Sequence, residues 1–261
     1  MVHAAWTLLL ASAPDSQTAT AAALGIAVVV FAPFAALGWD VDAEAIPYLA
    51  GSALFELGFF ASLGLVLRTG HVSLVYPLSR GVAPVLVLVV GAVALGIHVG
   101  ALQAIGVAVI AAGVVTVRGL DSTASARDTG LALACGGCIA GYTLVDSYGL
   151  RHAAPVPYLE CVLVLTIAVY LPVLARLRGA RAIAAAAGPR IALAAVCIFG
   201  AYALVLAALR LAPAAPVAAL RETSVVFATA YAALVLGEPA GPRRLAGATA
   251  VVTGIAVLAL A

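Results

Sequence analysis

The sequence predicts an all-α integral membrane protein with ten transmembrane helices, the first of them short, arranged as two inverted five-helix repeats. Three observations lead to this fold class: an apolar composition, a series of apolar segments of membrane-spanning length, and an internal repeat. Of the 261 residues, 65% are hydrophobic and 9% are charged, whereas soluble domains are about half apolar and about a quarter charged. A soluble chain could not bury so much apolar surface, which excludes a soluble enzyme, a nucleic-acid-binding module and a secreted disulfide scaffold.

The first apolar segment, residues 2–13, is too short to cross a bilayer by itself. It is interpreted as a signal peptide ending at Ala11-Ser12-Ala13, as a half-helix, or as a shortened transmembrane helix. The segment has no basic n-region and is shorter than signal peptides of about 15–30 residues. We therefore expect a shortened first transmembrane helix.

Nine further apolar segments are each long enough to cross a bilayer as a helix. Such a helix needs about 20 apolar residues, and polar residues, Pro or Gly separate one segment from the next. In chain order the predicted helices span residues 20–38, 46–67, 73–95, 99–117, 129–150, 156–174, 191–209, 213–236 and 245–261.

The arginine residues are concentrated in alternate loops between these segments. One set of loops holds Arg68, Arg118, Arg127, Arg176, Arg178, Arg181, Arg190, Arg243 and Arg244. The other set holds Arg151 and Arg210, with the acidic run Asp40, Asp42 and Glu44. Cytoplasmic loops carry the excess of basic residues, so the first set is predicted to be cytoplasmic. We expect a multi-pass protein of the plasma membrane, in bacteria the inner membrane.

An internal repeat relates the two halves of the chain. A shift of 141 residues superposes, without a gap, Arg80 on Arg221, Gly96 on Gly237, Gly106 on Gly247 and Gly113 on Gly254. Each repeat, residues 1–120 and 121–261, then contains five helices, and an odd number requires opposite orientations in the membrane. Inverted repeats are typical of secondary transporters, whose substrate site lies near the midplane. The alternative is a duplication retained only for packing.

Ionisable residues inside the spans are the candidate functional groups, because a charge in hydrocarbon costs several kcal/mol or more unless it is paired or hydrated. They are Glu56, Arg80, Asp146, Glu160, Arg221 and Glu222, with His3 in the short first helix.

Arg80 has the strongest case for a binding role. Tyr76 lies four residues before it and shares its helix face, and Pro77 and Pro84 interrupt the helical hydrogen bonds nearby. An arginine in this setting is suited to hold a carboxylate or phosphate group through paired hydrogen bonds. The alternative is an arginine that extends to the cytoplasmic interface.

Arg221 and Glu222 are adjacent in a predicted continuous helix, about 100° apart around its axis, so we expect no pairing between them. One side chain would face the cavity while the other meets a neighbouring helix. A structural ion pair of Arg221 with Glu56 or Glu160 and a ligand-binding role are equally open.

Glu56, Asp146 and Glu160 are candidate proton carriers, because a low dielectric favours the protonated carboxyl group. Asp146 and Glu160 lie near the ends of their spans, where we expect interfacial solvation, whereas Glu56 lies deeper. The aromatic residues Trp6, Tyr142, Tyr148, Tyr158 and Tyr202 form either cavity walls or an interfacial aromatic belt. Tyr142 and Tyr202 lie in mid-span, which favours the cavity.

No catalytic residue, metal site or cofactor site is predicted, because the sequence has no HExxH, Walker loop or GxSxG motif. The Cys135-Gly-Gly-Cys138 spacing is interpreted as helix packing by small residues. The chain is therefore predicted not to be an enzyme, with a membrane-embedded enzyme as the alternative class.

Three stretches carry a resemblance to a known family. Residues 73–84 read Ser-Leu-Val-Tyr-Pro-Leu-Ser-Arg-Gly-Val-Ala-Pro. Residues 220–227 read Leu-Arg-Glu-Thr-Ser-Val-Val-Phe and run into Leu-Gly-Glu-Pro at 236–239. Residues 3–6 read His-Ala-Ala-Trp. With the ten-helix count, the chain resembles the EamA-type transporters of the drug/metabolite transporter (DMT) superfamily. It departs from the family pattern at Thr7, where Asn is common, and at Ile97-His98, where Glu typically follows Gly.

The resemblance implies a basket of ten helices in two inverted halves and transport by alternating access without ATP. Helices three, four, eight and nine would line the central cavity. The predicted function is secondary transport or export of a small polar metabolite, an amino acid or related organic anion. An exporter of drug-like amphiphiles is the alternative.

The predicted substrate-binding residues lie on several spans and include the candidate coupling groups Glu56 and Glu222. They are Trp6, Glu56, Tyr76, Arg80, Tyr142, Tyr202, Arg221 and Glu222. The expected partners are a small-molecule substrate, the lipid bilayer and a proton as candidate coupling ion. No nucleic acid is expected as a partner, and a monomer suffices.

Overall fold

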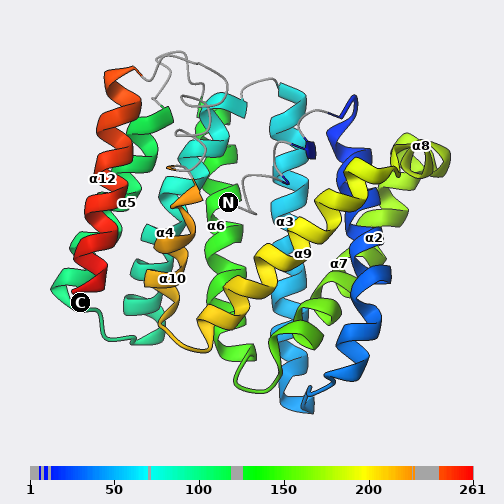
Figure 1. Cartoon of the computed structure of the whole chain (residues 1–261), viewed down its shortest axis with the longest axis horizontal. Helices are drawn as coiled ribbons and strands as arrows, with labels where there is room; N and C mark the ends of the chain where they lie inside the picture. The colour runs from blue at the N-terminus through cyan, green and yellow to red at the C-terminus, as the bar shows by residue number, and fades with distance from the viewer. Residues whose placement is uncertain are drawn as a thin grey trace. The chain divides into compact units, whose positions relative to one another are not determined.

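The computed structural model describes residues 13–69, 72–118, 126–224 and 241–260, together with residues 6, 9, 10 and 226. Within these ranges the backbone alone is described at residues 64, 66–69, 72–78, 117–118, 128, 244 and 259. The described chain is helical apart from turns, loops and one isolated β-bridge (Figure 1). The prediction of an all-α protein is confirmed.

Each of the nine long predicted segments has a helix in the described chain. These helices are α2 (Ser16–Leu37), α3 (Ile46–Thr69), α4 (Val72–Leu95), α5 (Ala101–Arg118), α6 (Ala126–Gly149), α7 (Pro155–Arg178), α9 (Pro189–Leu209), α10 (Ala214–Arg221) and α12 (Pro242–Ala259). Two short elements that were not predicted, η1 (Ala43–Ala45) and α8 (Ala180–Ala186), lie between them. The predicted first helix, residues 2–13, lies largely outside the described residues.

The predicted helix over residues 213–236 is wrong at its centre. Helix α10 ends at Arg221, and Glu222 and Thr223 form a turn. Their backbone N–H groups donate to the carbonyl groups three residues earlier, of Ala219 and Leu220, at 3.0 Å. The uniform apolarity of residues 213–236 predicts one long helix. Apolarity cannot reveal the turn inside this segment, because buried polar contacts stabilise that turn.

Helix ends follow the distribution of Pro, Gly and capping side chains. Helix α2 begins after Asp15, whose side chain accepts a hydrogen bond from the Gln17 N–H at 3.0 Å, as capping residues do. Helix α7 has proline at its start and ends at Gly179, whose φ is 90°. Proline fits the first helical turn because no N–H is needed there, and glycine tolerates a positive φ.

Five helical segments of the described chain are long and apolar enough to cross a membrane. They are Ser16–Leu37, Ala43–Leu63, Thr129–Gly149, Pro155–Arg178 and Pro189–Leu209. Large apolar side chains also face outwards: Val29 and Leu37 are 75% and 88% exposed. Such surfaces are costly in water and favourable in lipid. The number of ten spans and the inverted repeats stay predictions.

The chain forms two compact units, and the division falls within α3 and α6. Unit 1 comprises Met1–Leu57 and Val145–Leu211, and unit 2 comprises Gly58–Leu144 and Ala212–Ala261. These units are defined by packing, whereas the predicted halves, residues 1–120 and 121–261, are defined by the sequence repeat. The division into those halves stays a prediction.

In unit 1, helix α2 packs against α7, α8 and α9, and α7 packs against α9 (Figure 1). The rings of Phe31 and Phe199 stack with centroids 3.9 Å apart and fix the α2–α9 contact. At one end of this unit, the guanidinium of Arg178 lies 3.7 Å from the Asp15 carboxylate and donates a hydrogen bond to Gln17 at 2.9 Å.

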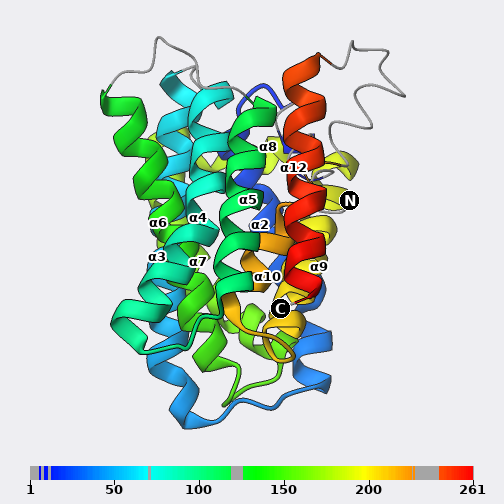
Figure 2. The same cartoon turned by 90° about the vertical axis from the view of Figure 1, so that its left-hand side faces the viewer.

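In unit 2, α5 and α12 run side by side, as Figures 1 and 2 both show, and α4 packs on α5. The buried core comprises Val107, Ile110, Val114, Ala219 and Val251. Helix α10 contacts α4, α5 and α12, so the turn that follows Arg221 is held against this core.

Candidate functional site

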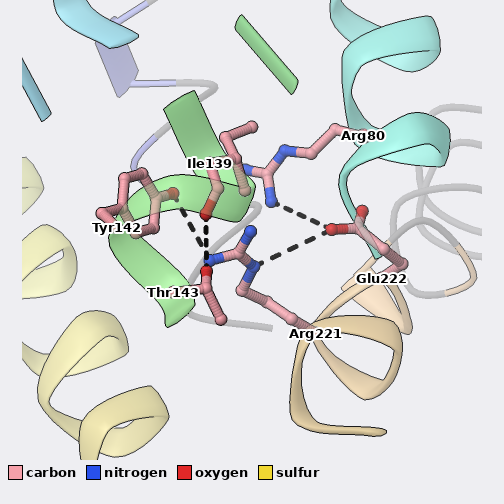
Figure 3. Close-up of polar contacts among 6 residues, drawn as sticks. All are labelled: Arg80, Ile139, Tyr142, Thr143, Arg221 and Glu222. Carbon is pink, nitrogen blue, oxygen red and sulfur yellow. Dashed lines mark hydrogen bonds and ion pairs between the residues drawn. The ribbon is translucent and has the colours of Figure 1, made fainter. Parts of the chain in front are cut away.

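Arg80, Arg221 and Glu222 form a buried charge cluster in unit 2, as Figure 3 shows. The Arg80 Nη1 group donates to the Glu222 Oε1 atom at 3.3 Å, and the Arg221 Nε atom lies 3.8 Å from the same oxygen. The Arg80, Arg221 and Glu222 side chains are 5%, 5% and 1% exposed. One carboxylate therefore lies between two guanidinium groups inside the protein.

The turn after α10 makes this arrangement possible. We expected that Arg221 and Glu222 would not pair, and that Arg221 would pair with Glu56 or Glu160 if its role were structural. The first expectation is wrong, because Glu222 is the cap residue of α10, with φ −75° and ψ −3°, and its carboxylate lies 3.8 Å from Arg221. The 100° spacing of a continuous helix no longer applies there, and both side chains turn to the same side. A pairing of Arg221 with Glu56 or Glu160 stays a prediction.

Helix α6 supplies neighbouring polar and aromatic groups, and α3 supplies Phe59. The Arg221 Nη1 group donates to the Tyr142 hydroxyl at 3.4 Å, and the Arg221 guanidinium lies 5.9 Å from the Tyr142 ring centroid. Phe59 meets that ring edge-on, with centroids 6.3 Å apart. Thr143 donates to the Ile139 carbonyl at 2.7 Å (Figure 3). The charge cluster is thus bordered by an aromatic pair.

Small residues let α4 approach α6 beside the cluster. A Cβ atom at Gly136 would lie 2.9 Å from the Ser79 carbonyl oxygen, so only glycine fits this contact. Arg80 follows Ser79 and is 4% exposed. Its guanidinium points to Glu222 rather than along α4 to the helix end, which argues against the interfacial alternative.

The cluster leaves hydrogen-bonding capacity unused. Among the described residues, the Nε and Nη2 groups of Arg221 and the Oε2 atom of Glu222 are buried without a hydrogen-bond partner. A buried donor or acceptor that stays unpaired costs about 1–3 kcal/mol, and more for charged groups. Such groups are suited to a bound polar molecule.

A second polar cluster lies in unit 1 around Asp146, which is 0% exposed. The Tyr158 hydroxyl donates to its Oδ1 atom at 3.1 Å, and the Tyr202 hydroxyl donates to its Oδ2 atom. The expected interfacial solvation is wrong for Asp146, because two tyrosines replace water around its carboxylate. It is wrong for Glu160 as well, whose carboxylate oxygens are buried.

The remaining predicted site residues are distributed as follows. Glu56 is 6% exposed in unit 1, and its Oε2 atom accepts a hydrogen bond from Thr166 at 3.4 Å. Trp6, also in unit 1, is 8% exposed. The side chain of Tyr76 lies outside the described residues. Unit 2 thus brings together four predicted residues, Arg80, Tyr142, Arg221 and Glu222, and Tyr202 donates to Asp146 in unit 1.

The comparisons with known proteins agree with this architecture. The model of the EamA-like transporter family matches residues 129–260, the C-terminal half of the chain. A crystal structure described as "Crystal structure of protein" has a TM-score of 0.72 over 99% of this chain and 93% of that chain, at 16% identity. A likeness at this identity shows the fold. Among curated proteins, none matches.

Proposed function

The chain belongs to the EamA-like transporter family of the DMT superfamily, and we propose that it is a secondary transporter that exports a small polar metabolite across the plasma membrane. The proposed substrate is an amino acid or a related organic anion, carried by alternating access through a central cavity. The observation that carries this proposal is the buried cluster of Arg80, Arg221 and Glu222.

The two arginines of the cluster favour a carboxylate on the substrate. Two guanidinium groups lie against one carboxylate, in side chains that are at most 5% exposed. Arginines inside a membrane protein pair with anionic groups, and a carboxylate of the substrate would be a second such group. Arginine is suited to this task because its planar fork holds a carboxylate through two hydrogen bonds.

The unused atoms favour an amino acid among organic anions. The Nη2 group of Arg221 is a donor and the Oε2 atom of Glu222 is an acceptor, and both are buried without a partner in the described chain. A zwitterion presents the complementary pair, a carboxylate for the arginine and an ammonium group for the glutamate. The Tyr142 and Phe59 rings beside the cluster would contact an apolar substrate side chain.

The packing of α5 on α12 supports the proposed inverted repeats. A Cβ atom at Gly113 would lie 2.8 Å from the Gly247 carbonyl oxygen, and one at Gly106 would lie 3.1 Å from that of Gly254. The sequence repeat matches Gly106 with Gly247 and Gly113 with Gly254. In the structure, Gly106 meets Gly254, the counterpart of Gly113, and Gly113 meets Gly247, the counterpart of Gly106. A two-fold axis produces this reciprocal pattern.

Glu56 is the better of the two proposed coupling groups. The Glu222 carboxylate already contacts Arg80 and Arg221. Glu56 has a hydroxyl neighbour, Thr166, and interacts electrostatically with Asp146. A proton is the coupling ion that this assignment proposes.

Thermal unfolding of the detergent-purified chain tests the substrate class. The ligands are glycine, L-alanine, L-leucine, L-phenylalanine, L-glutamate, succinate and tetraphenylphosphonium. At a concentration 100 times Kd, a ligand that binds only the folded chain stabilises it by about 2.7 kcal/mol. We expect an L-amino acid to raise the midpoint of the wild type but not of Arg221→Ala. Counterflow of the same amino acid in proteoliposomes then distinguishes transport from binding.

The matched control is Arg210→Ala, because Arg210 is exposed at the end of α9. This variant should respond to the amino acid as the wild type does. Midpoint shifts from tetraphenylphosphonium alone, unchanged in Arg221→Ala, would contradict the proposal and favour an exporter of amphiphiles.

A further inference from the structure

The loops between α2 and α3 and between α6 and α7 lie side by side in unit 1. The Asp42 N–H donates to the His152 carbonyl at 2.9 Å, and the Ala154 N–H donates to the Asp40 carbonyl at 2.7 Å. Between these bonds, Val41 and Ala153 form an antiparallel bridge. Two loops far apart in the sequence are therefore fixed against each other by their backbones.

Three side chains of these loops converge on one point. One ligand atom from each of Asp42, Glu44 and His152 lies within 4.8 Å of the other two. The two carboxylates are exposed and the imidazole is half-buried. None of the three side chains makes a hydrogen bond or an ion pair to a described residue. Two carboxylates that approach each other repel unless a cation lies between them.

The imidazole is held in place by aromatic stacking. The ring of His152 lies parallel to that of Tyr48, with centroids 5.9 Å apart and an interplanar angle of 7°. Tyr48 in turn stacks on Tyr148 at 6.5 Å. The guanidinium of the adjacent Arg151 lies 4.6 Å from the Tyr148 ring centroid. The ring nitrogens of His152 are thus oriented without using either as a hydrogen-bond donor.

We propose that Asp42, Glu44 and His152 bind a divalent transition-metal ion, with Zn²⁺ as the best match. One imidazole and two carboxylates form a mixed nitrogen and oxygen donor set, and Zn²⁺ takes such ligands at about 2.0–2.2 Å. Ligands at the corners of a tetrahedron of this size lie about 3.4 Å apart, so ligand atoms that lie within 4.8 Å of one another need to approach by at most about 1.4 Å. Ca²⁺ and Mg²⁺ prefer oxygen ligands alone.

The bound ion would connect the two loops through their side chains, in addition to the backbone bridge. The site lies at the end of unit 1 that carries the α2–α3 loop, whereas Asp15 and Arg178 lie at the other end of α2. The arginine distribution predicts that this end is extracytoplasmic. The inference rests on loop side chains outside the charge cluster and does not depend on the proposed transport.

Calorimetric titration of the full-length chain tests this site. The protein is purified in detergent without a histidine tag, treated with EDTA, and titrated with ZnCl₂ and, separately, MgCl₂. We expect saturable binding of one Zn²⁺ per chain and at least tenfold weaker binding of Mg²⁺. His152→Ala and Asp42→Asn should each weaken Zn²⁺ binding by at least about tenfold, as the loss of metal-site groups does.

Two matched variants control for other ligands of the same type. Asp40→Asn changes an exposed acid two residues from the cluster, and His98→Ala removes an exposed histidine of unit 2; both should keep the wild-type affinity. Asp42→Asn keeps the backbone N–H group that donates to the His152 carbonyl. The unfolding midpoint of this variant without metal should therefore equal that of the wild type. The proposal is overturned if the wild type binds no Zn²⁺, or if His152→Ala and Asp42→Asn bind it as tightly as the wild type.

Discussion

At the scale of single residues, Glu222 determines how the buried charges of unit 2 are balanced. Its Oε1 atom lies 3.3 Å from Arg80 and 3.8 Å from Arg221. The position that the repeat matches to Glu222 is Gly81, where a Cβ atom would lie 2.8 Å from the Val115 side chain. The first repeat therefore has no room for a second carboxylate, and one acid serves both arginines.

Glu222→Gln should destabilise the protein, because it removes the carboxylate that two buried guanidinium groups contact. Removal of one partner of a buried ion pair costs about 3–5 kcal/mol. Unfolding of the detergent-purified variant, followed by circular dichroism, measures the loss.

The control for this variant is Asp15→Asn, which removes an exposed ion pair with Arg178. Asparagine still caps α2, and an exposed pair contributes at most about 1 kcal/mol. If Glu222→Gln loses no more stability than Asp15→Asn, the two arginines do not depend on Glu222.

At the scale of secondary-structure elements, the crossing of α5 and α12 depends on glycine. Gly106 and Gly113 on α5 face Gly254 and Gly247 on α12, and backbone meets backbone at these points. Membrane helices associate through such small residues because close approach gains van der Waals contacts that lipid cannot replace. Buried Val107, Ile110 and Val251 fill the space beside the glycines.

Gly113→Ala should separate α5 from α12. The added methyl group would lie 2.8 Å from both the Gly247 carbonyl oxygen and the Val251 nitrogen, and backbone atoms cannot rotate away. Overpacking of this kind costs about 1–3 kcal/mol. The same unfolding assay measures the change.

Gly200→Ala on α9 is the matched control, because a Cβ atom there meets nothing within 4 Å. It should be neutral or stabilising, since alanine favours a helix over glycine by about 1 kcal/mol. Equal effects of the two substitutions would show that the α5–α12 crossing tolerates a side chain.

At the scale of the whole molecule, the arginine distribution predicts which ends of the helices face the cytoplasm. Helix α8 lies in an arginine-rich connection, and η1 follows the acidic residues Asp40 and Asp42. Within unit 1, the C-terminal end of α7 lies beside the N-terminal end of α2, because Arg178 pairs with Asp15, and α8 follows that end of α7. The element η1 follows the opposite, C-terminal end of α2. The two elements therefore mark opposite sides of the predicted membrane.

Labelling of single cysteines in intact cells tests this orientation. The four native cysteines are replaced, and cysteine is introduced at exposed Ala43 or exposed Ala184. A membrane-impermeant maleimide should label Ala43→Cys directly, but Ala184→Cys only after permeabilisation, since the arginine-rich side is retained in the cytoplasm. The reverse pattern would invert the topology.

The sequence by itself determined the helical membrane class, the family, the positions of the long helices and the charged residues inside them. These features are local: apolarity over about 20 residues and the placement of Pro and Gly specify a spanning helix whatever its neighbours are. Arg80 was identified as a candidate for this reason, because an arginine inside a span is exceptional in itself.

Only the tertiary structure decided which of these residues meet. The turn at Glu222 brings two arginines to one carboxylate, two tyrosines surround Asp146, and two distant loops join Asp42 and Glu44 to His152. No local pattern encodes these contacts, because each joins elements separated by many residues and depends on how the helices pack. Periodicity and apolarity report the environment of a segment, whereas pairing depends on the partner that packing provides.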